Sequence, residues 1–219
     1  MLTITVSDAI RQACPQLTLG LIWCEVTNSP FNENLWQNIT QTEEDFRKNF
    51  VIEQINKIPN IQATRTAYKA LGKDPNRYRP SAEALCRRIL RELPLYRINT
   101  LVDIINLVSI HTGYSIGGLD VDKIEGELLL TVGTPEDEFE AIGRGLLNIE
   151  GLPVYKDVQG GIGTPTSDNE RTKLSLETTH LLMIINGYSG KEEVQEAIDL
   201  SIQLLKKYAD LKAIETKIM

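Results

Sequence analysis

The spacing of hydrophobic residues along the chain predicts helices and strands interspersed with one another. Residues 17–26 alternate between apolar and polar and then become continuously apolar, which is typical of a largely buried strand. Apolar residues recur at helical spacing across 32–56, which predicts a long amphipathic helix that can break once. Shorter apolar runs predict further strands at 128–132, 154–157 and 181–185.

Polar residues that can cap helices indicate where the other helices begin. Ser7 is placed to cap a short helix that stops at Pro15, and Ser81 to cap a helix through about residue 92. The capping boxes Thr100–Asp103 and Ser189–Glu192 precede an almost wholly apolar helix to residue 110 and a closing amphipathic helix. The pattern predicts an α+β fold of layered sheets and helices, in a single domain over residues 1–219.

Composition narrows the class of protein. The 219 residues are 42% hydrophobic and 24% charged, as in ordinary globular proteins. No apolar run approaches the roughly 20 residues that span a bilayer, and the first residues lack the basic start and apolar stretch of a signal peptide. The three cysteines are odd in number and widely spaced, which argues against a disulfide framework. We expect a cytoplasmic protein with reduced thiols and no membrane partner.

The distribution of charge points to a polyanionic partner. The net charge is −7, yet residues 65–97 hold nine basic and three acidic residues, which gives +6 there and −13 over the remainder. Arginines concentrated on one element can neutralise phosphates whatever the overall balance. An internal arrangement, in which the basic segment pairs with acidic residues of the same molecule, is an equal alternative. The candidate phosphate-binding residues are Arg77, Arg79, Arg87, Arg88 and Arg91.

Motifs for common cofactors and nucleophiles are weak or missing. His111 and His180 lie far apart, and no Cys or His pair has metal-ligand spacing, so we expect no metal. No phosphate loop or dinucleotide fingerprint occurs, so we expect no cofactor. The stretch 113–117 matches the G-x-S-x-G nucleophile elbow around Ser115. That elbow needs a strand before it and a helix after it, whereas here a predicted helix precedes it. A plain turn is the favoured interpretation.

The predicted 99–110 helix carries polar residues on one face. Asn99, Asp103, Asn106 and Ser109 follow one another at steps of four, three and three. Polar groups on a buried helix need hydrogen-bond partners, so this face either lines a pocket or braces the following turn, residues 113–120. Both interpretations stay open.

Several motifs together resemble a known family. The sequence has Asn99-x-x-Val102-Asp103-x-x-Asn106, then Gly113, then Asp120-x-Asp122-Lys123-Ile124-Glu125-Gly126. This order and spacing resemble the editing domain of the phenylalanyl-tRNA synthetase β chain. Four further segments resemble free-standing relatives of that domain: Arg77–Leu85, Val154–Asp157, Ser167-Asp168 and Arg171-Thr172. The resemblance covers roughly residues 65–185, with an N-terminal strand and helix and a C-terminal helix outside it.

The resemblance implies a pocket that hydrolyses the ester of a wrongly charged tRNA in trans, so the implied partner is the aminoacylated acceptor end of tRNA. It assigns no catalytic residue and leaves the amino acid, the tRNA and the oligomeric state undetermined. Two positions differ from the family: Gly117 replaces a pocket histidine and Ile105 a threonine. A non-catalytic tRNA-binding module and a serine hydrolase that uses Ser115 are therefore the alternatives. The implied pocket residues are Asn99, Asp103, Asn106, Gly117, Gly118, Asp120 and Glu177.

Overall fold

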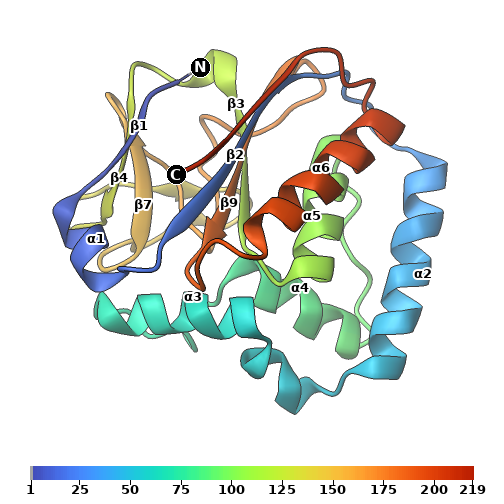
Figure 1. Ribbon diagram of the computed structural model, residues 1–219, viewed down its shortest axis with the longest axis horizontal. Helices are drawn as coiled ribbons and strands as arrows, with labels where there is room; N and C mark the ends of the chain where they lie inside the picture. Colours follow the sequence, from blue (N-terminus) through green and yellow to red (C-terminus); the bar gives the residue numbers. More distant parts are fainter. Residues whose placement is uncertain (1) are drawn as a thin grey trace.

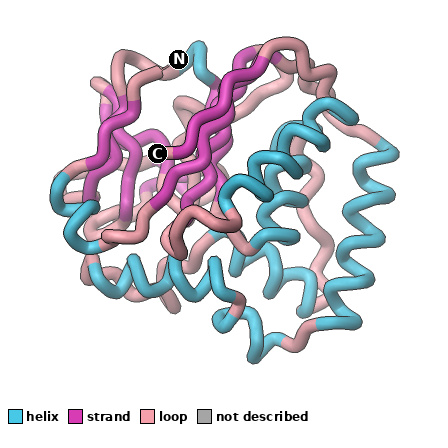
Figure 2. Tube along the Cα trace, viewed as in Figure 1, coloured by secondary structure: helices cyan, strands magenta, loops and turns pink. Residues whose placement is uncertain are grey.

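The computed structural model describes residues 2–219 and arranges them in three layers (Figures 1 and 2). Most helices lie on one side of a central four-stranded sheet, and a second four-stranded sheet lies on its other side. The molecule is thus an α+β fold, as the hydrophobic pattern predicts. No helix among the described residues is both long and apolar enough to cross a membrane.

The central sheet is antiparallel throughout, in the order β10-β2-β9-β3. Its strands are β2 (Thr18–Glu25), β3 (Ile116–Asp120), β9 (His180–Gly187) and β10 (Ile214–Ile218). The second sheet has the order β1-β4-β7-β8, with β1 parallel to β4. Its strands are β1 (Ile4–Val6), β4 (Leu128–Val132), β7 (Pro153–Asp157) and β8 (Gly160–Gly163). A small hairpin pairs β5 (Glu140–Ala141) with β6 (Gly145–Leu146).

The helices surround α5, whose apolar surface is covered on nearly every side. α5 packs against α6, α4, α2 and β3, which explains why its sequence is apolar almost all round. The α-helices are α1 (Asp8–Ala13), α2 (Glu33–Asn49), α3 (Pro59–Ala70), α4 (Ser81–Leu90), α5 (Thr100–Thr112) and α6 (Val194–Tyr208). Two 3₁₀ helices are η1 (Ile52–Lys57) and η2 (Val121–Lys123).

Two large apolar clusters hold the layers together. β2 is buried on both faces because alternate side chains point to opposite sides of a strand. Ile22 and Cys24 enter the cluster between the central sheet and the helices, whereas Leu21 and Trp23 enter the cluster between the two sheets. This double burial accounts for the continuous apolar run in the sequence.

Several predicted element boundaries need correction. Asn99, rather than Thr100, caps α5, because its Oδ1 accepts a hydrogen bond from the Val102 amide at 3.0 Å. Pro80 and Glu193 occupy the cap positions of α4 and α6 without side-chain caps, so the predicted roles of Ser81 and Ser189 are wrong. The predicted 113–120 turn is also wrong in its second half, where β3 forms the edge of the central sheet.

Candidate functional site

The polar face of α5 meets α2 rather than the 113–120 segment. Asp103 is only 2% exposed, and its carboxylate accepts hydrogen bonds from Trp36 Nε1 at 2.7 Å and from the Ile98 amide at 3.3 Å. Burial raises the pKa of Asp103. Of the two interpretations of this face, bracing of the 113–120 segment is therefore wrong for Asp103, which instead ties the start of α5 to α2.

Asn106 lies one helical turn further along the same face. It is half-buried and lines a small cavity together with Trp36, Tyr96 and Asp103. The polar face thus opens toward α2 and the connection between α4 and α5.

The two glycines of β3 have different surroundings. A Cβ at Gly118 would lie 2.3 Å from Cδ1 of Ile105, so any larger residue here would displace the buried Ile105 side chain that packs α5 against β3. A Cβ at Gly117 would meet Oδ1 of Asp168 at 3.5 Å, an ordinary contact distance. Gly117 is also half-exposed. Gly118 therefore serves packing, whereas Gly117 leaves space beside an acidic side chain.

Asp168 lies against the edge of β3 and was not among the predicted site residues. Its Oδ2 accepts a hydrogen bond from the Gly118 amide at 3.2 Å. A Cβ at Gly163 would lie 2.9 Å from its Oδ1, so this glycine also makes room for the carboxylate. Burial raises the pKa of Asp168 to about 7, and part of its surface still reaches solvent. Such a carboxylate takes up and releases a proton near neutral pH, as a general base must.

Asp120 and Glu177 lie at the other end of β3. Asp120 is 4% exposed, accepts a hydrogen bond from Thr178 Oγ1 at 2.8 Å and forms an ion pair with Lys123 at 3.1 Å. Glu177 is exposed, and a hydrogen bond with Ser175, together with the charge of Lys123, lowers its pKa. At about 3.3 Å per residue, Asp120 is about 10 Å from Gly117 along the strand.

The predicted pocket residues are therefore divided among three places. Asn99, Asp103 and Asn106 face α2 or the start of α5, Gly117 and Gly118 lie beside Asp168, and Asp120 and Glu177 lie near Lys123. Their role in binding a substrate stays a prediction. The signal that could have pointed to Asp168 was its place after the glycine-rich 160–163 stretch, within a motif already noted for its resemblance.

Ser115 is not a nucleophile. The residue is fully buried, and its Oγ accepts a hydrogen bond from the Ala82 amide at 3.4 Å. A helix precedes it and a strand follows, the reverse of a nucleophile elbow. His180 and Asp120, the histidine and aspartate that a triad with Ser115 would need, are engaged elsewhere: His180 pairs with Asp122 at 2.9 Å and Asp120 with Thr178. The serine hydrolase alternative is therefore wrong.

The basic segment divides into paired and solvent-facing arginines. Glu83 is 1% exposed and lies 2.8 Å from Arg65, 2.8 Å from Arg87 and 3.6 Å from Arg79. Arg77 and Arg91 are exposed. Internal pairing thus accounts for Arg79 and Arg87, and the binding of tRNA by all five predicted arginines stays a prediction. The guanidinium of half-buried Arg88 instead stacks on a tyrosine ring.

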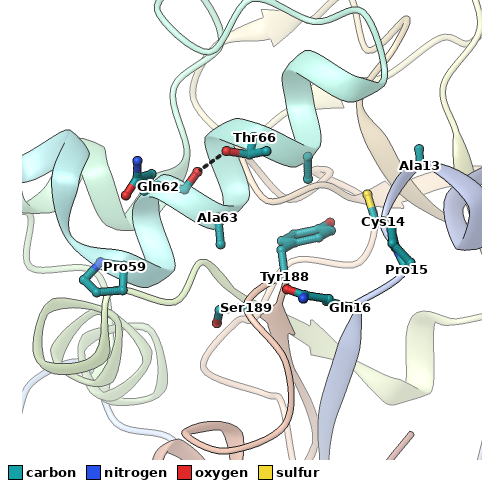
Figure 3. Close-up of a pocket in the computed structure, with 11 residues that line it drawn as sticks. Ala13, Cys14, Pro15, Gln16, Pro59, Gln62, Ala63, Thr66, Tyr188 and Ser189 are labelled. Carbon is teal, nitrogen blue, oxygen red and sulfur yellow. Dashed lines mark hydrogen bonds between the residues drawn. The ribbon is translucent and has the colours of Figure 1, made fainter.

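A pocket of about 460 Å³ lies between the α1–β2 turn, α3 and the loop after β9 (Figure 3). The side chains of Gln16, Gln62 and Tyr188 line it beside Cys14, and none of its lining residues is charged. Burial raises the pKa of both Cys14 and Tyr188, so neither is ionised at neutral pH. This pocket can hold a small uncharged group but supplies no base for hydrolysis.

Metal chemistry has no candidate centre in the part of the chain that the structure describes. No group of three or more His, Cys, Asp or Glu side chains within residues 2–219 is placed to hold a metal ion.

Comparisons with known proteins identify relatives of the part of the chain that contains these residues. The sequence model of the B3/4 domain family matches residues 63–210, which include α5, β3 and Asp168. No curated protein sequence matches the chain. A similar solved structure is an N-terminal fragment of the phenylalanyl-tRNA synthetase β-subunit from Pyrococcus horikoshii, with 14% identity and a TM-score of 0.46. The similarity covers 99% of this chain and 50% of that one, so the chain spans half the length of that fragment.

Proposed function

Because the chain belongs to the B3/4 domain family, we propose that it binds tRNA and hydrolyses the ester of a mischarged aminoacyl-tRNA in trans. The observation that carries the proposal is the carboxylate of Asp168 beside Gly117 and Gly118. The resemblance to the synthetase editing domain assigns both glycines to the substrate pocket. A tRNA substrate implies a cytoplasmic location.

The proposed reaction uses Asp168 to activate water. The carboxylate accepts a proton as the water oxygen attacks the ester carbonyl carbon. The bond to the terminal ribose oxygen breaks, that oxygen takes up a proton, and the products are the free amino acid and intact tRNA. Gly117, which has no side chain, leaves room for the aminoacyl group, and the vicinal hydroxyl of the ribose assists in positioning the water.

The test is deacylation of a panel of misacylated tRNAs. Asp168→Asn should lower the hydrolysis rate by about 100-fold or more, since general bases contribute 10²–10⁴-fold. Asp199→Asn, an exposed change on α6, serves as the control. Gly117→Leu should abolish hydrolysis by filling the space beside Asp168, while tRNA affinity is preserved. Hydrolysis by Asp168→Asn at the normal rate would remove Asp168 from the mechanism.

A non-catalytic tRNA-binding module is the second candidate. It is favoured by Gly117 at the position of the family's pocket histidine and by Asp103, which is sequestered against Trp36. This candidate predicts that no misacylated tRNA in the panel is hydrolysed, while uncharged tRNA binds with an affinity that falls steeply with salt.

A further inference from the structure

The connection between α4 and α5 carries an unusual concentration of exposed apolar side chains. Leu93 is 45% exposed, Tyr96 63% and Ile98 55%. Phe31, in the loop before α2, is 45% exposed. Large apolar groups exposed together on a surface are typical of interaction sites, whereas single scattered ones are not. The connection passes beside α2 on the helical side of the molecule (Figure 1).

Guanidinium groups alternate with the aromatic rings at this surface. Arg88 lies over the ring of Tyr96, 4.0 Å from its centroid, and donates a hydrogen bond from Nε to the Pro94 carbonyl at 2.7 Å. Arg97 lies 4.6 Å from the ring of Trp36 and 5.4 Å from that of Phe31.

The two arginine–ring groups lie close to each other in the fold. Trp36, which contacts Arg97, and Tyr96, which contacts Arg88, line the same small cavity. We call Phe31, Arg88, Arg91, Leu93, Tyr96, Arg97 and Ile98 the aromatic–arginine surface.

The charge of this surface selects the partner. Its arginines are opposed by Glu92, which is exposed in the same connection, and by Asp103 and Glu43, which lie behind it. Asp103 and Glu43 are largely buried, so Glu92 is the only exposed acid in this connection beside the three arginines, and the exposed groups are positive on a protein that is otherwise acidic. A partner that combines negative charge with flat apolar faces fits these groups.

We propose that the aromatic–arginine surface binds unpaired nucleotides of RNA, with a base stacked on Tyr96 and the phosphates beside Arg91 and Arg97. Unpaired bases stack on aromatic rings and guanidinium planes, and their phosphates pair with arginine. Bases within a duplex are already stacked on one another, so a paired segment offers only its phosphates. The inference rests on the proposed tRNA-binding function, and it specifies a single-stranded segment as the part that this surface contacts.

The test measures fluorescence anisotropy of a labelled single-stranded RNA of about 12 nucleotides, a length within the usual site sizes, and of the matched RNA duplex. The wild-type protein should bind the single strand more tightly than the duplex. Tyr96→Ala should raise the Kd for the single strand by about 5-fold or more, the loss of one stacked base. Tyr96→Phe keeps the ring and should stay within about twofold of wild type.

Control variants remove groups that are equally accessible elsewhere. Val158 is 74% exposed and Arg144 is exposed, and both lie outside this surface. Val158→Ala and Arg144→Ala should leave the Kd unchanged, whereas Arg97→Ala should raise it and reduce its salt dependence. Tyr96 is mostly exposed, so its replacement should not unfold the protein.

Equal binding of duplex and single strand, or an unchanged Kd for Tyr96→Ala, overturns the inference. Absence of RNA binding by the wild-type protein also overturns it and leaves a protein partner for this surface. Deacylation separates this result from the proposed function. A Tyr96-dependent single-strand affinity without hydrolysis of any misacylated tRNA supports the inference and refutes the hydrolase. Hydrolysis that depends on Asp168, with single-strand binding insensitive to Tyr96, supports the proposed hydrolase and refutes this inference.

Discussion

Replacement of Glu83 by glutamine tests whether this buried carboxylate neutralises the arginines of the basic segment, residues 65–97. The side chain is 1% exposed, and its two oxygens serve Arg65 and Arg87 at 2.8 Å and Arg79 at 3.6 Å. Glutamine keeps the shape but removes the negative charge, so three guanidinium groups face one another without neutralisation. Removal of one partner of a buried ion pair costs about 3–5 kcal/mol.

The magnitude for this cluster lies at the lower end of that range. The arginine side chains are 11%, 18% and 35% exposed for Arg65, Arg87 and Arg79, so water screens part of their repulsion. We therefore expect Glu83→Gln to lower the free energy of unfolding by about 3 kcal/mol. The cluster joins α3 to α4, since Arg65 lies on the first and Glu83 on the second.

The assay is urea unfolding followed by tryptophan fluorescence. Glu136→Gln, a change at an exposed residue that has no ion pair among the described residues, should alter the free energy by less than about 0.5 kcal/mol. Addition of about 1 M salt should reduce the difference between wild type and Glu83→Gln only slightly, because buried pairs are poorly screened. A loss for Glu83→Gln as small as that of the control would refute the internal pairing.

Three further predictions concern the edge of β3. Burial raises the folded pKa of Asp168 to about 7, above the unfolded value of about 3.9, so the folded state binds more protons between these values. The free energy of unfolding should therefore fall as pH rises from about 4 to about 7. Urea unfolding of Asp168→Asn should lack the part of this pH dependence that Asp168 causes. Gly118→Ala should lower the unfolding free energy by about 1–3 kcal/mol through the clash with Ile105, and Gly117→Ala by less than about 0.5 kcal/mol; equal losses would contradict the two environments. Ser115→Ala should retain hydrolysis of misacylated tRNA, and a trapped acyl-serine would contradict this.

The helices and the long buried strands could be predicted because their hydrophobic pattern reflects burial directly. β2 and β9 are apolar on both faces, and α2 shows a clear amphipathic period. β3 was missed because Gly117 and Gly118 contribute no hydrophobic signal and glycine pairs are typical of turns. The close approach of α5 that requires Gly118 is a tertiary contact, which no local pattern records.

The shared face of Asp103 and Asn106 was also predictable, because helical spacing fixes which residues lie together. The neighbour of that face was not. Trp36, which donates the hydrogen bond to Asp103, lies 67 positions away in the sequence. Spacing within one helix therefore identifies a set of polar groups, while the fold decides whether they meet a ligand or another helix.

The charge of residues 65–97 is a second case in which the sequence gives the residues but the fold determines their contacts. The excess of +6 counts every arginine equally, yet a single buried carboxylate, Glu83, engages three of them. Reversal of the charge at Arg87 would therefore disturb the fold before it reported on RNA. Arg91 has no such partner among the described residues and is exposed. An effect of Arg91→Glu on tRNA affinity would consequently report on the interface itself, because this change leaves the Glu83 cluster intact.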